Sequence, residues 1–467
     1  MVEEKVKTIE LKANSNREFF LIHGYTGSPT DFNNLPAYLN KKFNANVKII
    51  LLRGHGTNVK DLDNLEYEDF FKQIKRELEK DIRKGRRIIL GGISFGAMLA
   101  LTFSSEYPIL GVFDVCPPYL FKFPFNVWGI GVLRKYKKYW GKNRCENEKE
   151  KRKNAFSYDF MHVNGFFISK QAAQKLREKF ENINCPILSI HSYLDPIGHY
   201  ASIRDINKKV KSFVKQQKIF NTKVHNLFFS EYDDEICGVI GDFIEKNNLF
   251  GKKDENKVAA IIPSFNESKR IRSVLKVISK SKSIDEIVVV DDGSRDNTYE
   301  IVRKFPKVRY FKNEKNLGKA ESMERGVFST DADIIFFCDA DLIGLNLEII
   351  KGIIEPVKRG DFNMFIGLRS NFMQKTIRLI ALNSGERAMR RIVWETLPKY
   401  FKYKYRVEAG LNCYVKKYFG GFGYKTFDYS QPVKEKKYGF FRGTILRWAM
   451  NMDVLFVYVR EIFGKHK

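Results

Sequence analysis

Several features that would place this protein in common functional classes are missing from its sequence. Only six cysteines occur in 467 residues, and none of them forms a Cys-x-x-Cys pair. The spacing argues against a zinc ribbon and against a dithiol redox centre. We therefore expect reduced and mostly buried thiols, as in a cytoplasmic protein.

Long apolar runs are also missing. The first residues, "MVEEKVKTIELK", are charged and do not form the apolar region of a secretory signal, and no run is long enough to span a bilayer. The nearest candidate, "GTILRWAMNMDVLFVYVREIFG", is interrupted by Arg447, Asp453 and Arg460. It predicts an amphipathic helix that packs on its domain or lies at a membrane surface. We expect a cytoplasmic protein, with peripheral contact at the inner face of the membrane as a hypothesis.

Acidic residues are few relative to basic ones. Lys and Arg number 82 against 55 Asp and Glu, a formal net charge of +27. This excess favours anionic partners such as phosphates, nucleotide sugars or acidic lipid surfaces, although a basic solvated surface alone would also produce it. No known nucleic-acid-binding module is recognisable, so we do not expect nucleic acid as a partner.

The chain is long enough for two or three domains, and its pattern changes accordingly. Residues 1–250 alternate short β-branched runs with amphipathic stretches, which predicts an α/β domain with a mainly parallel sheet. The alternation breaks at about 117–184, as in an inserted cap. The polar stretch 251–257 is predicted to be a linker. A second α/β alternation, without any repeat of the first, occupies 258–467.

The stretch "LGGISFGAMLA" places Ser94 between Gly92 and Gly96, after a predicted strand and before a predicted helix. This is the context of a nucleophile elbow, in which serine takes a strained conformation and the glycines prevent clashes. A serine nucleophile needs a base, which in turn needs an acid. Asp195 and His225 follow in the chain order that this fold requires. That order favours a nucleophile over a simple helix cap.

Acyl transfer also needs two backbone N–H donors for the developing negative charge. We expect one from Phe95, the residue after the nucleophile. We expect the other from Tyr25, in the loop "FLIHGYTGSPTDF" after the first core strand.

Residues 17–247 resemble α/β-hydrolases of the carboxylesterase and monoacylglycerol-lipase type. The resemblance rests on "HGYTGSPTDFNNLPAYL", "LRGHGTNVKDL", "GGISFGAMLAL", "SYLDPI" and the segment around His225. It implies hydrolysis of short or medium acyl esters beneath a cap, with Ser94 as nucleophile, Asp195 as acid and His225 as base.

The second half contains a different chemical signal. Asp339 and Asp341 follow the buried run "IIFFC", and alternate residues of a strand share one face. Both carboxylates can therefore point into one crevice at the carboxyl end of the sheet, where ligands bind in such folds. Hard divalent cations prefer carboxylate oxygens. We predict a Mg²⁺ or Mn²⁺ site that neutralises the diphosphate of a nucleotide-sugar donor.

Neighbouring stretches support this interpretation. "IIPSFNE" and "VVVDDGSRDNT" end two strands, and "NLGKAESMERG" begins a helix. Asp291 and Asp292 are predicted to bind the base and ribose, and Lys319 to meet phosphate. Residues 257 to about 370 resemble glycosyltransferase family 2 with the GT-A fold. The resemblance implies a nucleotide-sugar donor, a Mg²⁺ or Mn²⁺ ion, and roles for Pro263, Glu267, Asp291, Asp292, Lys319, Asp339 and Asp341.

The acceptor remains open between two classes. The motifs resemble polyprenyl-phosphate glycosyltransferases, whereas "LNSGERAMRRIVWETLPKYFKYKYRVEAGLNCY" resembles glucosyl-3-phosphoglycerate synthases and makes Glu386 and Glu408 acceptor-site candidates. Those synthases hold their metal partly with a histidine, but no histidine lies between His225 and His466 here. Gln431 is the candidate in its place. Both acceptor classes carry an anionic phosphate.

These patterns together predict a bifunctional enzyme, an esterase-type hydrolase fused to a metal-dependent glycosyltransferase. The alternative keeps the transferase and makes the first domain a non-catalytic module that binds acyl chains or lipid.

Overall fold

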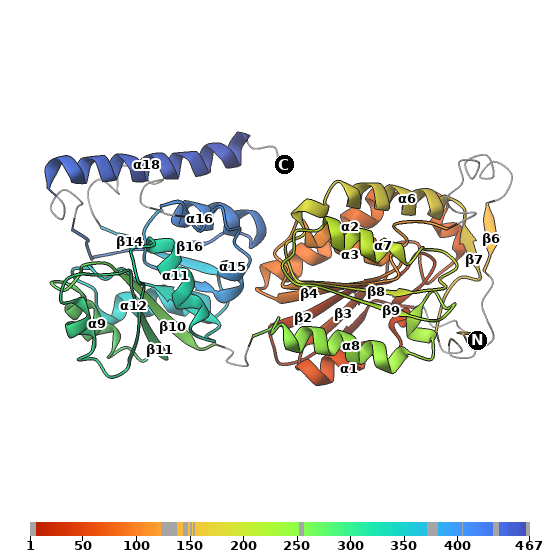
Figure 1. Cartoon of the computed structure of the whole chain (residues 1–467), viewed down its shortest axis with the longest axis horizontal. Helices are drawn as coiled ribbons and strands as arrows, with labels where there is room; N and C mark the ends of the chain where they lie inside the picture. Colours follow the sequence, from red (N-terminus) through yellow and green to blue (C-terminus); the bar gives the residue numbers. More distant parts are fainter. Residues whose placement is uncertain are drawn as a thin grey trace. The chain divides into compact units, whose positions relative to one another are not determined.

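The computed structural model describes residues 6–122, 138–142, 148–149, 152, 155–251, 256–370, 382–403, 405–432 and 439–463. The chain divides into two compact units, Met1–Ile82 with Arg86–Gly251, and Lys252–Lys467 with the short turn Arg83–Gly85 (Figure 1). Most of the predicted linker 251–257 and part of the predicted cap, including 123–137, lie outside the described residues.

The first unit is built on a seven-stranded sheet in the order β1-β3-β2-β4-β5-β8-β9. All its neighbouring strands pair in parallel except β1, which is antiparallel to β3. The inner strands are almost wholly buried apolar runs, as expected when helices cover both faces of a parallel sheet. The strands are β1 (Ile9–Leu11), β2 (Arg17–Ile22), β3 (Asn46–Ile50), β4 (Arg87–Ile93), β5 (Gly111–Val115), β8 (Ile187–Ser192) and β9 (Lys215–Phe220).

Helices cover both faces of this sheet (Figure 1). On one face α1 (Leu35–Phe43) and α8 (Asp233–Lys246) bury their apolar sides against β2 and β3 in a single core. The opposite face carries α2 (Tyr67–Arg83), α3 (Phe95–Ser104) and α6 (Asn164–Arg177). The remaining elements are α7 (Ala201–Lys209), the hairpin β6 (Tyr139–Gly141) and β7 (Phe160–His162), and the 3-10 turns Pro29–Phe32, Val59–Leu62, Phe180–Asn182 and Leu227–Phe229.

The second unit has a mixed seven-stranded sheet in the order β12-β11-β10-β13-β15-β14-β16. Strands β12, β11, β10 and β13 are parallel, β15 is antiparallel to both of its neighbours, and β16 is parallel to β14. The strands are β10 (Val258–Ser264), β11 (Glu286–Asp291), β12 (Val308–Lys312), β13 (Ile334–Phe337), β14 (Met364–Arg369), β15 (Arg387–Arg390) and β16 (Gly423–Phe427).

Its helices are also divided between the two faces of the sheet. Helices α9 (Ile271–Ile278), α10 (Thr298–Val302) and α12 (Leu347–Lys358) share one core with the strands. The other helices are α11 (Lys319–Phe328), α15 (Arg391–Glu395), α16 (Arg406–Tyr418) and α18 (Phe440–Phe463). The predicted C-terminal amphipathic stretch forms α18, which packs on α16.

The cysteines and the apolar character of the helices were the subject of two expectations from the sequence. Five cysteines lie in the described part of the chain, all as free thiols, of which Cys116, Cys237 and Cys338 are buried; Cys145 lies outside that part. Within the same ranges, no helix combines the length and the apolar character needed to cross a membrane.

One buried carboxyl group lies in the centre of the first sheet. Asp114 of β5 pairs with Gly92 on one side and Ser189 on the other, and its side chain is wholly buried. Ser189 Oγ donates a hydrogen bond of 2.6 Å to Asp114 Oδ2, whereas Oδ1 has no partner among the described residues. Burial raises the pKa of Asp114 to about 8, against the smaller lowering effect of the Ser189 hydroxyl. The folded protein therefore keeps this group protonated at neutral pH.

We expect Asp114→Asn to make folding less sensitive to pH. Between about pH 4 and pH 8 the unfolded chain loses this proton and the folded chain keeps it, so the contribution of Asp114 to stability falls as the pH rises. The free energy of unfolding of the variant, relative to wild type, should therefore increase by about 1 kcal/mol per pH unit across this window. Urea titrations at several pH values measure it. The exposed Asp242→Asn is the control, and a pH-independent difference for Asp114→Asn would contradict a buried, protonated carboxyl group.

Candidate active sites

The turn between β4 and α3 has the geometry predicted for a nucleophile. Ser94 has φ 56° and ψ −119°, and its N–H donates to the Val115 carbonyl at 2.8 Å. A Cβ at Gly92 would lie 2.3 Å from the carbonyl oxygen of Gly96, and one at Gly96 would lie 2.1 Å from that of Ile22. Only glycine fits at both positions, so the two glycines permit the strained turn that presents Ser94.

Three predicted side chains meet at this turn. His225 Nε2 lies 2.9 Å from Ser94 Oγ, and His225 Nδ1 lies 2.7 Å from Asp195 Oδ2. The other carboxylate oxygen of Asp195 accepts from the N–H groups of Ile197 at 2.7 Å and Gly198 at 3.1 Å. Burial raises the pKa of Asp195, but the adjacent His225 and these hydrogen bonds outweigh it, and the net pKa lies below its ordinary value. The carboxylate is therefore ionised and can orient the imidazole.

The two predicted oxyanion donors lie beside Ser94. Phe95 is the first residue of α3, where an N–H has no acceptor within the helix. A Cβ at Gly24 would lie 3.4 Å from Ser94 Cβ, so the loop that continues into Tyr25 passes next to the nucleophile. The Tyr25 ring packs edge-on against Phe95, with ring centroids 5.7 Å apart.

Two buried histidines connect this loop to the loop after β3. His23 Nε2 accepts the Leu52 N–H at 3.0 Å, and His55 Nε2 accepts the Thr26 N–H at 3.0 Å. Burial lowers the pKa of His23 to about 4 and that of His55 to about 3, so both rings are neutral and can accept. Each histidine thus binds the backbone of the opposite loop. The pair fixes the backbone on both sides of Tyr25.

One cysteine lies next to the triad. Cys116, Asp195 and His225 place possible ligand atoms within 4.8 Å of one another. Burial raises the pKa of the Cys116 thiol well above its usual range, and His225 and Asp195 already bind each other. The arrangement of hydrogen bonds is that of a hydrolytic triad, and we assign no metal to it.

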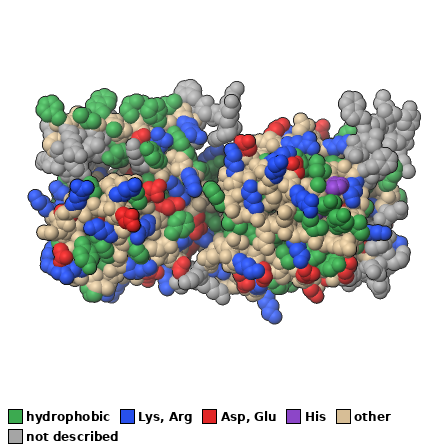
Figure 2. Space-filling model, viewed as in Figure 1, with side chains coloured by type: hydrophobic (Ala, Val, Ile, Leu, Met, Phe, Trp, Pro, Cys, Tyr) green, Lys and Arg blue, Asp and Glu red, His purple; other side chains and the backbone are tan. Residues whose placement is uncertain are grey.

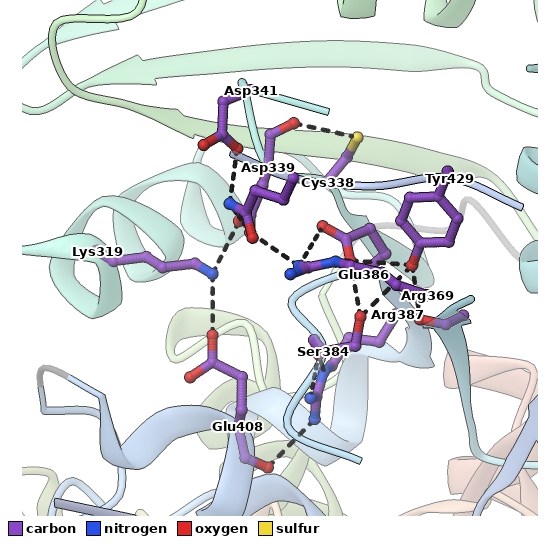
Figure 3. A network of polar contacts seen from close by, with 12 residues as sticks. Lys319, Cys338, Asp339, Asp341, Arg369, Ser384, Glu386, Arg387, Glu408 and Tyr429 are labelled. Carbon is purple, nitrogen blue, oxygen red and sulfur yellow. Dashed lines mark hydrogen bonds and ion pairs between the residues drawn. The ribbon is translucent and has the colours of Figure 1, made fainter. Parts of the chain in front are cut away.

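In the second unit, both predicted metal-binding carboxylates face one position at the end of β13. Gln431 Nε2 donates to Asp341 Oδ1 at 2.7 Å and to Asp339 Oδ2 at 3.2 Å. Lys319 Nζ, from the first residue of α11, lies 2.8 Å from Asp339 Oδ1 and 2.9 Å from Glu408 Oε1 (Figure 3). The structure therefore brings the two aspartates together with Lys319, Glu408 and Gln431.

These residues fit a hard divalent cation. The amide nitrogen of Gln431 lies within hydrogen-bond distance of both carboxylates, so a cation near the position of this nitrogen would be close to both of them. Rotation of the amide group would then turn the Gln431 oxygen toward the cation. A Cβ at Gly385 would lie 2.7 Å from Asp339 Oδ2 and 2.9 Å from Lys319 Nζ, so the glycine leaves room beside the carboxylate. Oxygen donors without a histidine or thiolate suit Mg²⁺ or Mn²⁺ better than zinc.

The two acceptor-site candidates have different surroundings. Glu386 is fully buried and contacts Arg369 Nη2 at 2.9 Å, while Ser384 and Tyr429 donate to it at 2.7 and 3.0 Å. Arg369 Nη2 also lies 3.6 Å from Asp339 Oδ2. Glu386 thus holds Arg369 beside the aspartate and is not open to a ligand. Glu408 contacts Lys319 directly.

Asp291, the last residue of β11, and Asp292, which follows it, hold neighbouring loops. Asp292 accepts from the backbone N–H groups of Leu317 and Gly318, both at 2.8 Å, and from Asn313 Nδ2 at 2.9 Å. It thereby fixes the turn that begins α11. Asp291 accepts from Ser294 N at 2.7 Å and from the Tyr310 hydroxyl at 2.5 Å.

The remaining predicted donor-site residues lie at the same edge of the sheet. Pro263 is next to last in β10 and pairs with Val290 of β11. Glu267 follows β10, where its N–H donates to Thr298 Oγ1 at 3.1 Å and its carboxylate contacts Arg270 at 3.0 Å. The edge therefore gathers acidic groups together with the cationic side chains of Lys319 and Arg369. Burial lowers the pKa of Lys319, but the neighbouring carboxylates of Asp339 and Glu408 raise it by more than burial lowers it. Lys319 therefore remains charged.

Comparison with known proteins agrees with this division. Residues 13–233 match the family model of serine aminopeptidase, S33, and residues 259–415 match that of glycosyl transferase family 2. The chain joins a hydrolase-type half to a family 2 glycosyltransferase-type half. The predicted resemblances and the predicted pair of α/β folds are confirmed.

Individual relatives match parts of the chain. An uncharacterised protein of Methanocaldococcus jannaschii is 51% identical over 119 residues, which cover 24% of this chain and 51% of that protein. A carboxylesterase of Bacillus subtilis is 25% identical over 235 residues, covering 50% and 93%. Glucosyl-3-phosphoglycerate synthase of Mycobacterium tuberculosis is 29% identical over 146 residues, covering 29% and 44%. The chain thus spans about half the length of two of these three relatives.

One solved structure is of the same synthase, in complex with Mn²⁺, uridine diphosphate and glucosyl-3-phosphoglycerate. It is 20% identical, with a TM-score of 0.38, and the match covers 44% of this chain and 80% of that one.

Some residues of both sites were not predicted from the sequence. Arg369 comes close to Asp339 from a segment without a recognised motif, and Gly385 does so from the stretch "LNSGERAMRR", in which only Glu386 was singled out. From their motifs, His23 and His55 are expected to shape turns beside the site, and the hydrogen bonds that they accept from the opposite loops are what the structure adds. No sequence signal marks Arg369.

Proposed function

We propose that this protein is a bifunctional enzyme, a serine ester hydrolase fused to a metal-dependent glycosyltransferase. The observation that carries the hydrolase is the chain of hydrogen bonds from Asp195 through His225 to Ser94. The transferase rests on the common position faced by Asp339, Asp341 and Gln431, next to Lys319.

In the hydrolase, His225 Nε2 takes the proton of Ser94 as Oγ attacks the acyl carbon of an ester. Asp195 keeps Nδ1 protonated and stabilises the imidazolium. The N–H groups of Tyr25 and Phe95 bind the oxyanion, and His225 then gives its proton to the leaving alcohol. Water hydrolyses the acyl-serine by the same groups in reverse. The substrate class is an acyl ester, in line with the similarity to the carboxylesterase of Bacillus subtilis.

The second candidate makes the first unit a non-catalytic module that binds acyl chains or lipid. The fold alone would serve such a role, because function depends on the site and not on the fold. The short His225–Ser94 contact favours catalysis, since a binding module has no need of an activated serine.

In the transferase, the donor is a nucleotide sugar whose diphosphate is held next to Lys319. A Mg²⁺ or Mn²⁺ ion, held by Asp339 and Asp341 with Gln431 as a further oxygen donor, would neutralise charge on the departing diphosphate. Lys319 supplies a fixed positive charge, and Asp292 positions it through the backbone at Leu317 and Gly318. Pro263, Glu267 and Asp291 line the donor end of the site.

The acceptor carries a phosphate, either a polyprenyl phosphate or a small phosphorylated molecule. The similarity to glucosyl-3-phosphoglycerate synthase of Mycobacterium tuberculosis supports the second class. An ionised phosphate needs no strong general base, which agrees with a site whose central side chains are already paired. Glu408, in contact with Lys319, is placed to orient an acceptor.

Replacing Ser94 by alanine tests the hydrolase. Cleavage of p-nitrophenyl esters should fall by several orders of magnitude, because the nucleophile is removed. A fluorophosphonate probe should label the wild-type chain and leave Ser94→Ala unlabelled. Ser105→Ala, at the other end of α3, is the matched control. A folded wild-type chain that is not labelled would favour the non-catalytic module, and full turnover by Ser94→Ala would exclude the nucleophile.

Calorimetry of uridine diphosphate with and without Mn²⁺ tests the metal site. We expect much tighter nucleotide binding with Mn²⁺, because the ion is shared between the diphosphate and the carboxylates. Asp341→Ala should remove this dependence and abolish sugar transfer, and EDTA should abolish transfer while ester cleavage continues. The exposed Asp361→Ala is the control. Equal affinity with and without Mn²⁺, together with an active Asp341→Ala, would refute the assignment.

A further inference from the structure

Helix α18 presents apolar side chains on its outer side. Ile445, Trp448, Met452, Leu455, Phe456 and Val459, here called the outer stripe, are between 41% and 69% exposed. Their spacing of three, four or seven residues places them on one face of the helix, over a length of about 20 Å. Figure 2 shows hydrophobic side chains gathered along α18. A single exposed leucine would be ordinary, but a continuous stripe with two aromatic residues marks an interaction surface.

The rotation of α18 about its axis is set by contacts on its other side. Val457 is fully buried, and Asp453 Oδ1 lies 3.4 Å from Arg406 Nε of α16. Arg460 stacks over the Tyr400 ring, with its guanidinium 3.8 Å from the ring centre. The one acidic residue among these therefore faces the domain. Turning the outer stripe inward would break the ion pair and expose Val457.

The charge around α18 indicates what the outer stripe binds. Residues 399–467 contain 15 Lys or Arg and only five Asp or Glu. Of these, Lys416, Lys417 and Arg460 are exposed on α16 and α18. An exposed apolar stripe in a strongly basic segment fits a membrane with anionic headgroups, which accepts the apolar side chains and attracts the cations. A second copy would bring the same basic surroundings against its own, which like-charge repulsion disfavours.

We infer that α18 lies on the surface of an anionic bilayer, with the outer stripe inserted at the level of the headgroups. The helix lies along the membrane and does not cross it. This attachment does not depend on either proposed activity, since it uses neither Ser94 nor the aspartates. Helix α18 then lies between the bilayer and α16, the helix whose Glu408 contacts Lys319.

Co-sedimentation of the full chain with vesicles tests the inference. The chain should bind phosphatidylcholine vesicles that contain about 30 mol% phosphatidylglycerol. Its binding to vesicles of phosphatidylcholine alone should be at least about tenfold weaker. Raising the salt from about 0.05 M to about 0.5 M should weaken binding, because it screens the attraction to the headgroups. Trp448→Glu with Phe456→Glu should reduce binding at least about tenfold.

Two controls distinguish the outer stripe from general stickiness. Phe213→Glu changes an apolar side chain of the first unit that is even more exposed, and it should leave binding unchanged. Light scattering reports whether the wild-type chain forms dimers that Trp448→Glu with Phe456→Glu dissociates. No binding to anionic vesicles at low salt would overturn the inference. The inference would also be overturned if the wild-type chain formed dimers that the double variant dissociates, while the double variant still bound vesicles fully.

Discussion

Both sites depend on one constraint: buried strands end at the carboxyl edge of a sheet and position there the side chains that follow them. Strand β4 ends at Ile93 and presents Ser94, and β13 ends at Phe337 shortly before Asp339. Because these strands are buried on both faces, neither can slip in register without exposing its apolar residues. The position of each reactive group is therefore set by the core. The loops that follow add the partners.

The two sites differ in the groups that compensate the charge of their carboxylates. In the first unit, one carboxylate, Asp195, is held by two backbone N–H groups and contacts the imidazole of His225. In the second unit, Asp339 is contacted by Lys319, Gln431 and Arg369, and Arg369 is in turn held by Glu386. This arrangement balances charge before a ligand arrives. An incoming diphosphate and its cation would exchange partners within the network and would not have to enter an uncompensated site.

The sequence predicted those parts of the fold and sites that depend on local pattern. Strand periodicity predicted the two α/β halves, and Ser94 could be placed because its two glycines are required by close backbone approach. Asp195 and His225 followed from chain order on that fold. That His23 and His55 shape turns beside the site could be expected from their motifs, but their hydrogen bonds to the opposite loops, and the approach of Arg369 and Gly385 to Asp339, depend on tertiary contacts. The contacts of Glu386 with Arg369, Ser384 and Tyr429 could not be read from the sequence for the same reason. Its role stays a prediction for activity measurements.

The central claim is that each half of the chain carries a complete site of its own. The most direct measurement uses one sample of full-length protein, whose serine is modified to completion with a fluorophosphonate before the Mn²⁺-dependent binding of uridine diphosphate is measured. We expect stoichiometric modification at Ser94 and an unchanged nucleotide affinity, and we expect the rate of modification to be unchanged when Mn²⁺ and the nucleotide are saturating. Loss of nucleotide binding after modification, or modification that the nucleotide blocks, would contradict two independent sites.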